Sequence, residues 1–90
     1  MSREYREFKI LNKYGLHARP AAQLVQTASK FNSEIFIEKG AVRINAKSIM
    51  GVLMLAAAQG TVLKIHAEGP DAAEAAEALG RLIEGKFGEE

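Results

Sequence analysis

With 90 residues, of which 48% are hydrophobic and 26% charged, the chain is expected to fold as one globular domain, residues 1–90. Its net charge of +1 disfavours a dedicated nucleic-acid-binding protein, because such proteins bind mainly through a strongly basic surface. The absence of cysteine excludes disulfide bonds, zinc–thiolate sites and thiol catalysis.

The first half of the chain shows the hydrophobic periods of strands and of one helix. In EYREFKILN, residues 4–12, apolar and charged side chains alternate, which predicts a half-buried strand. Over residues 17–31 apolar side chains recur at steps of three and four, which predicts an amphipathic helix. EIFIEK and AVRIN, residues 34–39 and 41–45, then predict two strands joined by a tight turn.

In the second half, SIMGVLMLAAA, residues 48–58, predicts a short apolar helix, and TVLKIHAE, residues 61–68, alternates clearly enough to predict a strand. GPD begins a last helix, with Pro70 in its first turn. The resulting order is βαββαβα. Because the strands have one apolar face, we expect an α+β fold in which all three helices pack on that face of a four-stranded, largely antiparallel sheet.

The segment GLHARPAAQL, residues 15–24, places a histidine where the first helix begins. The first N–H groups of a helix have no partners within it, and the helix dipole adds about half a positive charge there. This environment favours a neutral, nucleophilic imidazole at His17, with an anionic group bound beside it. The backbone N–H groups of Ala18 and Arg19, together with the Arg19 guanidinium, would orient phosphate oxygens. These residues predict a phosphoryl acceptor at His17 that needs little other machinery.

Two neighbouring residues suit this helix start. Pro20 is compatible with a first turn, where no backbone N–H is needed, and Gly15 permits a tight turn before it. A lone histidine near a helix end is nevertheless more often an ordinary surface residue than a nucleophile. The residues alone therefore leave both interpretations of His17 open.

GLHARPAA, followed further along by KSIMGV in a chain of this element order, resembles the HPr family. These proteins are the histidine-containing phosphocarriers of the bacterial phosphoenolpyruvate-dependent sugar phosphotransferase system. The resemblance covers essentially the whole chain and implies an open-faced β-sandwich. It implies that Enzyme I phosphorylates His17 on Nδ1 and that His17 passes the phosphoryl group to Enzyme IIA domains, with Arg19 and Pro20 completing the motif. It further implies a stoichiometric carrier rather than an enzyme, with no cofactor and no metal.

Three alternatives stand beside this interpretation. The sequence also resembles the nitrogen-branch paralogue of HPr, which shares both motifs. A purely regulatory binding module would use the same surface without phosphoryl transfer, and family variants of that kind carry glutamine in place of the histidine. An RNA-binding sheet domain would need aromatic and basic residues on its open face, where Tyr5 and Phe36 are the candidates. The chain departs from many family members at Tyr14, just before the glycine of the motif.

Ser48 opens the second predicted helix and is a good N-cap residue. The resemblance implies a second role, because in many bacteria the serine of this motif is phosphorylated by HPr kinase/phosphorylase. The two roles are compatible, since a phosphate at a helix N-terminus meets favourable N–H groups. The added negative charge would repel an acidic partner.

The second predicted helix has more apolar side chains than one buried stripe can hold, so some of them are expected to face outward. Exposed apolar side chains, especially the adaptable methionines, suit docking to several partners, although a core or a dimer seam is the more common explanation. The side chains expected to face the sheet are Val52, Leu55 and Ala56, and those expected to form a docking surface are Ala22, Ile49, Met50, Leu53 and Met54.

The remaining features predict little further chemistry. His66 lies between charged residues on the outward face of a strand and is expected to be an ordinary solvated histidine, not a metal ligand with His17. The longest apolar run is shorter than the roughly 20 residues of a membrane span, and the N-terminal segment has no signal core. We therefore expect a cytoplasmic protein that does not insert into membranes. A carrier with one shared docking surface is expected to be a monomer.

Overall fold

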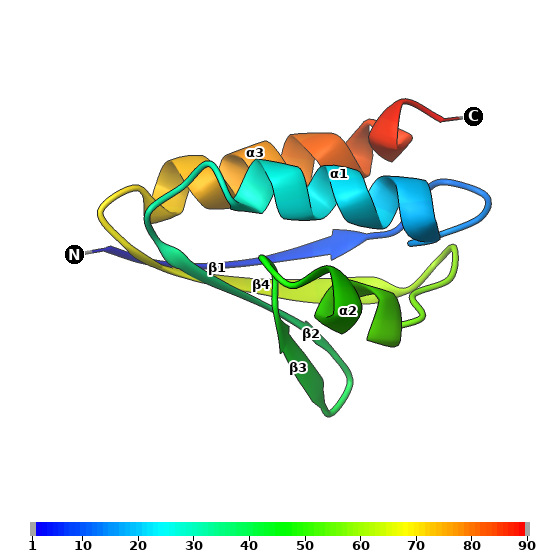
Figure 1. Ribbon diagram of the computed structural model, residues 1–90, viewed down its shortest axis with the longest axis horizontal. Coiled ribbons are helices and arrows are strands. Elements are labelled where there is room, and N and C mark those ends of the chain that lie inside the picture. The colour runs from blue at the N-terminus through cyan, green and yellow to red at the C-terminus, as the bar shows by residue number, and fades with distance from the viewer. Residues whose placement is uncertain (1, 90) are drawn as a thin grey trace.

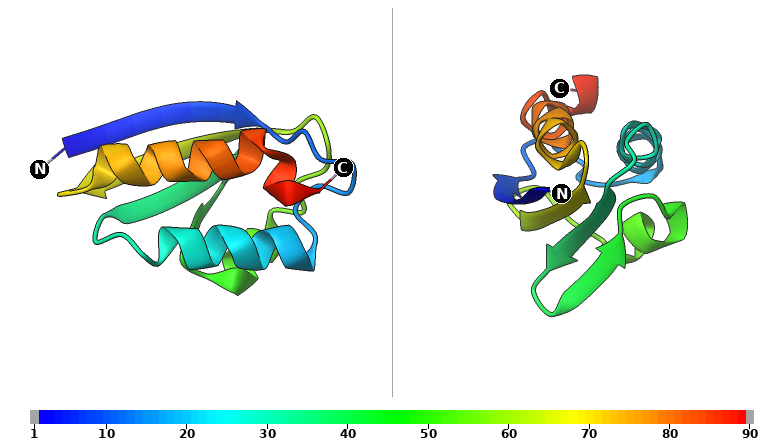
Figure 2. Two further views of the ribbon diagram at one scale, coloured as in Figure 1. Left: turned by 90° about the horizontal axis from the view of Figure 1, so that it is seen from above. Right: turned by 90° about the vertical axis from the view of Figure 1, so that its left-hand side faces the viewer.

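Four strands and three helices follow one another in the order βαββαβα in the computed structural model, which describes residues 2–89 (Figure 1). The strands form one antiparallel sheet in the order β1-β4-β2-β3, and the helices cover one of its faces (Figure 2). This arrangement confirms the predicted α+β fold. The elements are β1 (Ser2–Lys9), α1 (Ala18–Ala28), β2 (Glu34–Lys39), β3 (Val42–Asn45), α2 (Ile49–Met54), β4 (Val62–Gly69), α3 (Ala72–Glu84) and a short 3-10 turn, η1 (Lys86–Gly88).

The hydrophobic core lies between the sheet and the helices. In the register of β2 and β4, Ile35 pairs with Ala67 and Ile37 pairs with Ile65, so these four buried side chains share the core face. Burying each isoleucine or leucine stabilises the fold by about 1.5–3 kcal/mol. The largest fully buried apolar side chains are those of Ile10, Leu24, Ile35, Ile37, Val52, Leu63, Ile65, Leu79 and Ile83.

Asp71 joins the segment after α1 to the start of α3. Its carboxylate accepts hydrogen bonds from the backbone N–H groups of Asn32 and Ser33, both at 2.9 Å, and from the Ser33 hydroxyl at 2.6 Å. The hydrogen bond from the Ser33 hydroxyl, followed by that from the Asn32 N–H, lowers the pKa of Asp71 below its ordinary value. The resulting stability is fully present above the pKa of the unfolded chain and is lost as the pH falls through the lower, folded pKa.

The end of α1 and the start of α3 differ from the prediction. α1 ends at Ala28, because the chain tightens there and the N–H of Phe31 donates to the Ala28 carbonyl. α3 begins at Ala72 and not at Pro70. Its N-cap Asp71 has a non-helical backbone (φ −121°, ψ 32°), so the prediction that Pro70 lies in the first turn is wrong.

α2 ends at Met54, earlier than predicted. The Lys39 ammonium group donates to the carbonyls of Leu55 at 2.9 Å and Ala56 at 3.3 Å, which satisfies carbonyls left free at the end of the helix. Ala56 then adopts a positive φ of 47° and turns the chain away. Ala56 is therefore exposed, so the prediction that it faces the sheet is wrong, whereas Val52 and Leu55 are buried as predicted.

The loop before α1 lies directly on the backbone that follows α2. The N–H of Leu16 donates to the Ala57 carbonyl at 2.9 Å, and Gly15 has a φ of 65°, in the left-handed region. A Cβ on Gly15 would lie 2.2 Å from the Ala57 carbonyl oxygen and 2.9 Å from the Ala58 Cα. Glycine is therefore required here both for its φ and for the close approach of two backbones.

We expect Gly15→Ala to lower the free energy of unfolding by about 3 kcal/mol, from left-handed backbone strain and steric overlap together. Gly40→Ala is the matched control, because Gly40 has a similar φ of 58° but no atom within 4 Å of the added Cβ. In the control, the free energy of unfolding should fall by only about 1 kcal/mol, from backbone strain alone. Urea denaturation of both variants measures the difference, and equal losses would show that the Ala57 contact carries no energy.

Candidate functional site

His17 is the N-cap residue of α1. Its backbone is extended (φ −73°, ψ −175°), its carbonyl accepts a hydrogen bond from the Ala21 N–H at 3.0 Å, and its side chain makes no capping hydrogen bond. The imidazole is 42% exposed and lies at the start of the helix without capping it. Ala18 and Arg19, the first two helical residues, have backbone N–H groups without a partner inside the helix.

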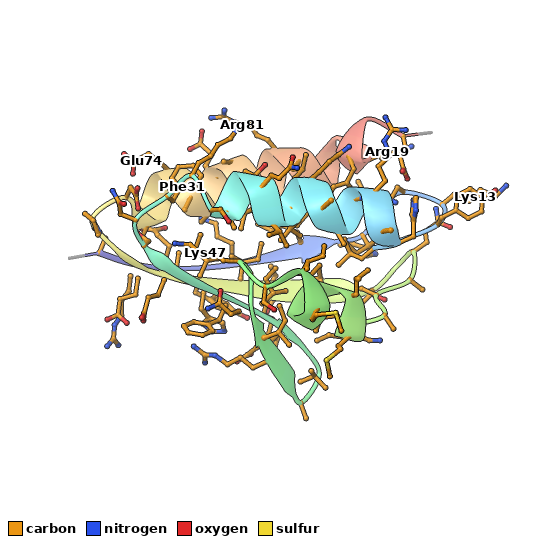
Figure 3. The ribbon with its side chains drawn as sticks, in the orientation of Figure 1. Lys13, Arg19, Phe31, Lys47, Glu74 and Arg81 are labelled. Atoms are coloured by element: carbon orange, nitrogen blue, oxygen red, sulfur yellow. The ribbon has the colours of Figure 1, made fainter. Side chains whose placement is uncertain are left out.

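The cationic side chains near His17 lie at one end of the molecule. Figure 3 shows Arg19 at the N-terminal end of α1 and Lys13 on the loop before it. Arg19 is exposed, and Pro20, the third helical residue, is buried. The predicted placement of both residues in the first turn is confirmed. It puts a positively charged residue in the turn whose N–H donors have no partner inside the helix, which suits an anionic ligand.

Asn12 fixes the loop that carries His17. Its side-chain amide donates to the Gly15 carbonyl at 2.8 Å, while the Gly15 N–H donates to the Asn12 carbonyl at 3.2 Å. Asn12 is fully buried. Together with the Leu16–Ala57 hydrogen bond, this pair holds both sides of the turn, so the start of α1 has a defined position.

The Glu89 carboxylate, from the far end of the chain, contacts the His17 ring. Its two oxygens lie 2.9 Å and 3.1 Å from Nε2, and one of them accepts a hydrogen bond from the Asn12 amide at 3.1 Å. The hydrogen bond with His17 is the largest cause that lowers the pKa of Glu89 below its ordinary value. Within residues 2–89, Nδ1 of His17 makes no hydrogen bond.

Tyr14, the departure noted in the sequence, stands beside the same imidazole. The two rings meet edge to face, with centroids 6.1 Å apart and an interplanar angle of 85°. Tyr14 is 71% exposed, and the Lys13 ammonium lies 5.4 Å from the centroid of its ring. His17 is thus flanked by an aromatic ring as well as by a carboxylate.

Ser48 is the N-cap residue of α2, as predicted. Its hydroxyl accepts a hydrogen bond from the Gly51 N–H at 3.1 Å. The side chain is half-buried, and it lies at the start of a helix that packs against α1 (Figure 1). The structure therefore gives Ser48 a structural role, the capping of α2.

Apolar side chains are exposed along α2. Met54 is 72% exposed and Met50 is 66% exposed, whereas Ala22 of α1 is half-buried. The predicted exposure of the α2 residues is confirmed, and their role in docking stays a prediction. We define the α2 patch as Ile49, Met50, Leu53 and Met54.

His66 differs from the ordinary solvated histidine that was predicted. Its side chain is 33% exposed, its Nε2 lies 3.3 Å from a carboxylate oxygen of Glu38, and its ring centroid lies 5.0 Å from that of Tyr5. The reason is register, because Tyr5 of β1 and Phe36 of β2 flank it on the open sheet face. His66 lies within strand β4 and not at the N-terminus of a helix, so it is a suitable control for His17.

Sequence reasoning did not identify Asn12 or Glu89 as site residues. Glu89 lies 72 positions from His17 in the chain, and no local pattern marks it. Among residues 2–89, no group of three or more histidine and acidic side chains could hold a metal ion. The same part of the chain has no helix that is long and apolar enough to cross a membrane.

Comparison with known proteins identifies the family. The family described as "PTS HPr component phosphorylation site" matches residues 5–85. The chain belongs to the HPr family. HPr of Neisseria meningitidis serogroup A is 54% identical over 81 residues, which cover 90% of this chain and 91% of that protein.

Other HPr-family proteins agree with this assignment. The crystal structure of HPr-C-His from Thermoanaerobacter tengcongensis superposes with a TM-score of 0.93 at 57% identity, and the match covers 97% of this chain and 98% of that one. The HPr-like protein Crh of Halalkalibacterium halodurans is 49% identical over 79 residues, 88% of this chain and 94% of Crh. This chain is therefore a phosphocarrier of the phosphotransferase system, a carrier protein and not an enzyme.

Proposed function

We propose that His17 accepts a phosphoryl group on Nδ1 from phospho-Enzyme I and passes it to Enzyme IIA domains during sugar uptake. One observation carries this proposal: His17 stands at the N-terminus of α1 with Nε2 engaged by Glu89 and Nδ1 without a hydrogen bond among residues 2–89. The nitrogen that is left without a hydrogen bond in this part of the chain is therefore the one that the family resemblance implies.

The transfer needs no separate base in this chain. The lone pair of Nδ1 attacks phosphorus while the bond from phosphorus to the donor breaks, and the ring keeps its proton on Nε2 and gains a positive charge. The N–H groups of Ala18 and Arg19 and the Arg19 guanidinium bind the phosphoryl oxygens through the transition state. Passing the group to an acceptor reverses these steps and regenerates the neutral ring.

Two alternative functions would use the same surface. A nitrogen-branch carrier would use the same chemistry with different acceptors. A regulatory binding module, for which the similarity to Crh is relevant, would bind partners without transferring a phosphoryl group. The presence of His17 at a helix N-terminus favours a carrier, because a regulator needs no nucleophile there.

We expect one acid-labile phosphoryl group when the protein is incubated with phosphoenolpyruvate, magnesium and Enzyme I, as measured by intact mass before and after acid treatment. His17→Ala should abolish the modification. His66→Ala is the matched control and should keep it, because His66 lies on the open sheet face. Equal modification of the wild type and of His17→Ala would refute the assignment, and an unmodified wild type with active Enzyme I would favour the regulatory module.

The α2 patch and Ala22 are proposed as the surface on which Enzyme I and Enzyme IIA dock. α2 packs against α1, which brings exposed apolar side chains to the side of the helix that carries His17. Methionine adapts its shape to different partners, as a carrier between several proteins requires. A monomer leaves this surface free, so the expectation of a monomeric carrier is part of the same proposal.

Met50→Glu should weaken transfer from Enzyme I and to Enzyme IIA by about tenfold each, the typical loss at an interface centre. Val62→Glu is the control, because Val62 is similarly apolar, 45% exposed and on the open face of the sheet. Rates at sub-saturating partner concentration give the comparison. The docking surface would be wrong if Met50→Glu transferred as fast as the control.

Ser48 is proposed as the site of regulatory phosphorylation by HPr kinase/phosphorylase. Ser48→Asp should slow transfer from Enzyme I several-fold, because it adds negative charge beside the α2 patch. Its thermal stability should change little, since aspartate is also a good N-cap. Ser48→Asn keeps a capping side chain without the charge, and its transfer rate should remain near that of the wild type. If both variants were equally slow, charge would not be the cause.

A further inference from the structure

A left-handed turn directs the end of the chain towards His17. Lys86, Phe87 and Gly88 have consecutive positive φ values of 57°, 55° and 76°. Such angles are uncommon for residues other than glycine, and the burial of Phe87, which is 3% exposed, offsets their cost. The turn brings the segment after α3 to the N-terminal end of α1 (Figure 2).

Glu89 follows this turn and is held from two sides. Its carboxylate lies 2.9 Å and 3.1 Å from Nε2 of His17 and accepts a hydrogen bond from the Asn12 amide at 3.1 Å. The same amide donates to the Gly15 carbonyl in the turn before α1. Only 18% of the Glu89 side chain is exposed, so the carboxylate has a defined position against the imidazole.

The chemistry of these atoms determines the position of a proton. An ionised carboxylate can only accept hydrogen bonds, so the Nε2 atom facing it must carry hydrogen. The pKa of Glu89 is lowered chiefly by this contact, with the Asn12 hydrogen bond and the nearby charge of Arg19 acting in the same direction, so the carboxylate is ionised at neutral pH. In a neutral imidazole with hydrogen on Nε2, the lone pair lies on Nδ1.

We propose that Glu89 is a positioning residue that makes Nδ1 the phosphoryl-accepting nitrogen of His17, an inference that rests on the proposed function of His17. Glu89 sets the tautomer and the ring orientation, and Asn12 sets the position of Glu89. The same carboxylate accepts a hydrogen bond from Nε2–H of the phosphorylated ring and keeps that proton in place, so that the ring leaves as neutral imidazole when the bond from Nδ1 to phosphorus breaks. Glu89 thus acts in both halves of the transfer without contacting the phosphoryl group.

The first test needs no partner protein. Long-range ¹H–¹⁵N spectra of the protein report which ring nitrogen of His17 carries hydrogen. We expect hydrogen on Nε2 in the wild type and a larger fraction on Nδ1 in Glu89→Ala. Glu89→Gln should stay close to the wild type, because its amide oxygen also accepts a hydrogen bond from Nε2–H. Glu84→Ala, which removes an exposed carboxylate at the end of α3, is the matched control and should change nothing.

The second test measures phosphoryl transfer from Enzyme I in the same variants. Glu89→Ala should be about tenfold slower than the wild type, the effect of losing one charge-assisted hydrogen bond, with partial rescue in Glu89→Gln. An unchanged nitrogen signature in Glu89→Ala would overturn the proposal, even if transfer slowed, because the defect would then lie in partner binding. Failure of the wild type to accept phosphate would instead refute the function of His17, and the spectra would still decide whether Glu89 sets the tautomer.

Discussion

The backbone contact between Gly15 and Ala57 is the constraint on which the functional end of the molecule depends. It joins the loop before α1 to the segment after α2, and the two backbones lie too close together for a side chain at position 15. The hydrogen bond from the Leu16 N–H to the Ala57 carbonyl also fixes the orientation of the two segments. One glycine therefore fixes two elements relative to each other, the helix that begins at His17 and the short helix that exposes the α2 patch.

Charges of opposite sign reach His17 from different parts of the chain. The positive contribution comes from α1 itself, through Arg19 and the N–H groups of the first turn, which have no partner inside the helix. The negative contribution comes from Glu89 and faces one ring nitrogen. The two ring nitrogens of His17 therefore lie in different electrostatic surroundings, with Nε2 against the Glu89 carboxylate.

The fold was predictable because it depends on local periodicity. Alternation along β4 and the helical spacing that begins at His17 each reflect which side chains face the core. Ser48 could be identified as an N-cap for the same reason, since a cap contacts only the next turn. These features need no knowledge of distant residues.

The features that were not predicted depend on contacts between distant residues. The end of α2 is stabilised by Lys39 of β2, which binds the carbonyl of Leu55 just after the helix. Pro70 lies outside α3, where the carboxylate of the N-cap Asp71 binds the backbone of the segment after α1. Glu89 reaches His17 only after α3 has crossed the length of the sheet and the chain has reversed in a left-handed turn. No pattern within a window of a few residues can encode such contacts.

The two ends of α1 respond differently to acid. At the His17 end, amide and carbonyl groups that do not titrate fix the turn through Asn12, Gly15 and Ala57. At the other end, the Asp71 carboxylate carries the junction with α3, and protonation removes its charge. Protonation of Asp71 therefore loosens the junction between the segment after α1 and α3, whereas the amide hydrogen bonds that hold the turn before His17 are not themselves removed by acid.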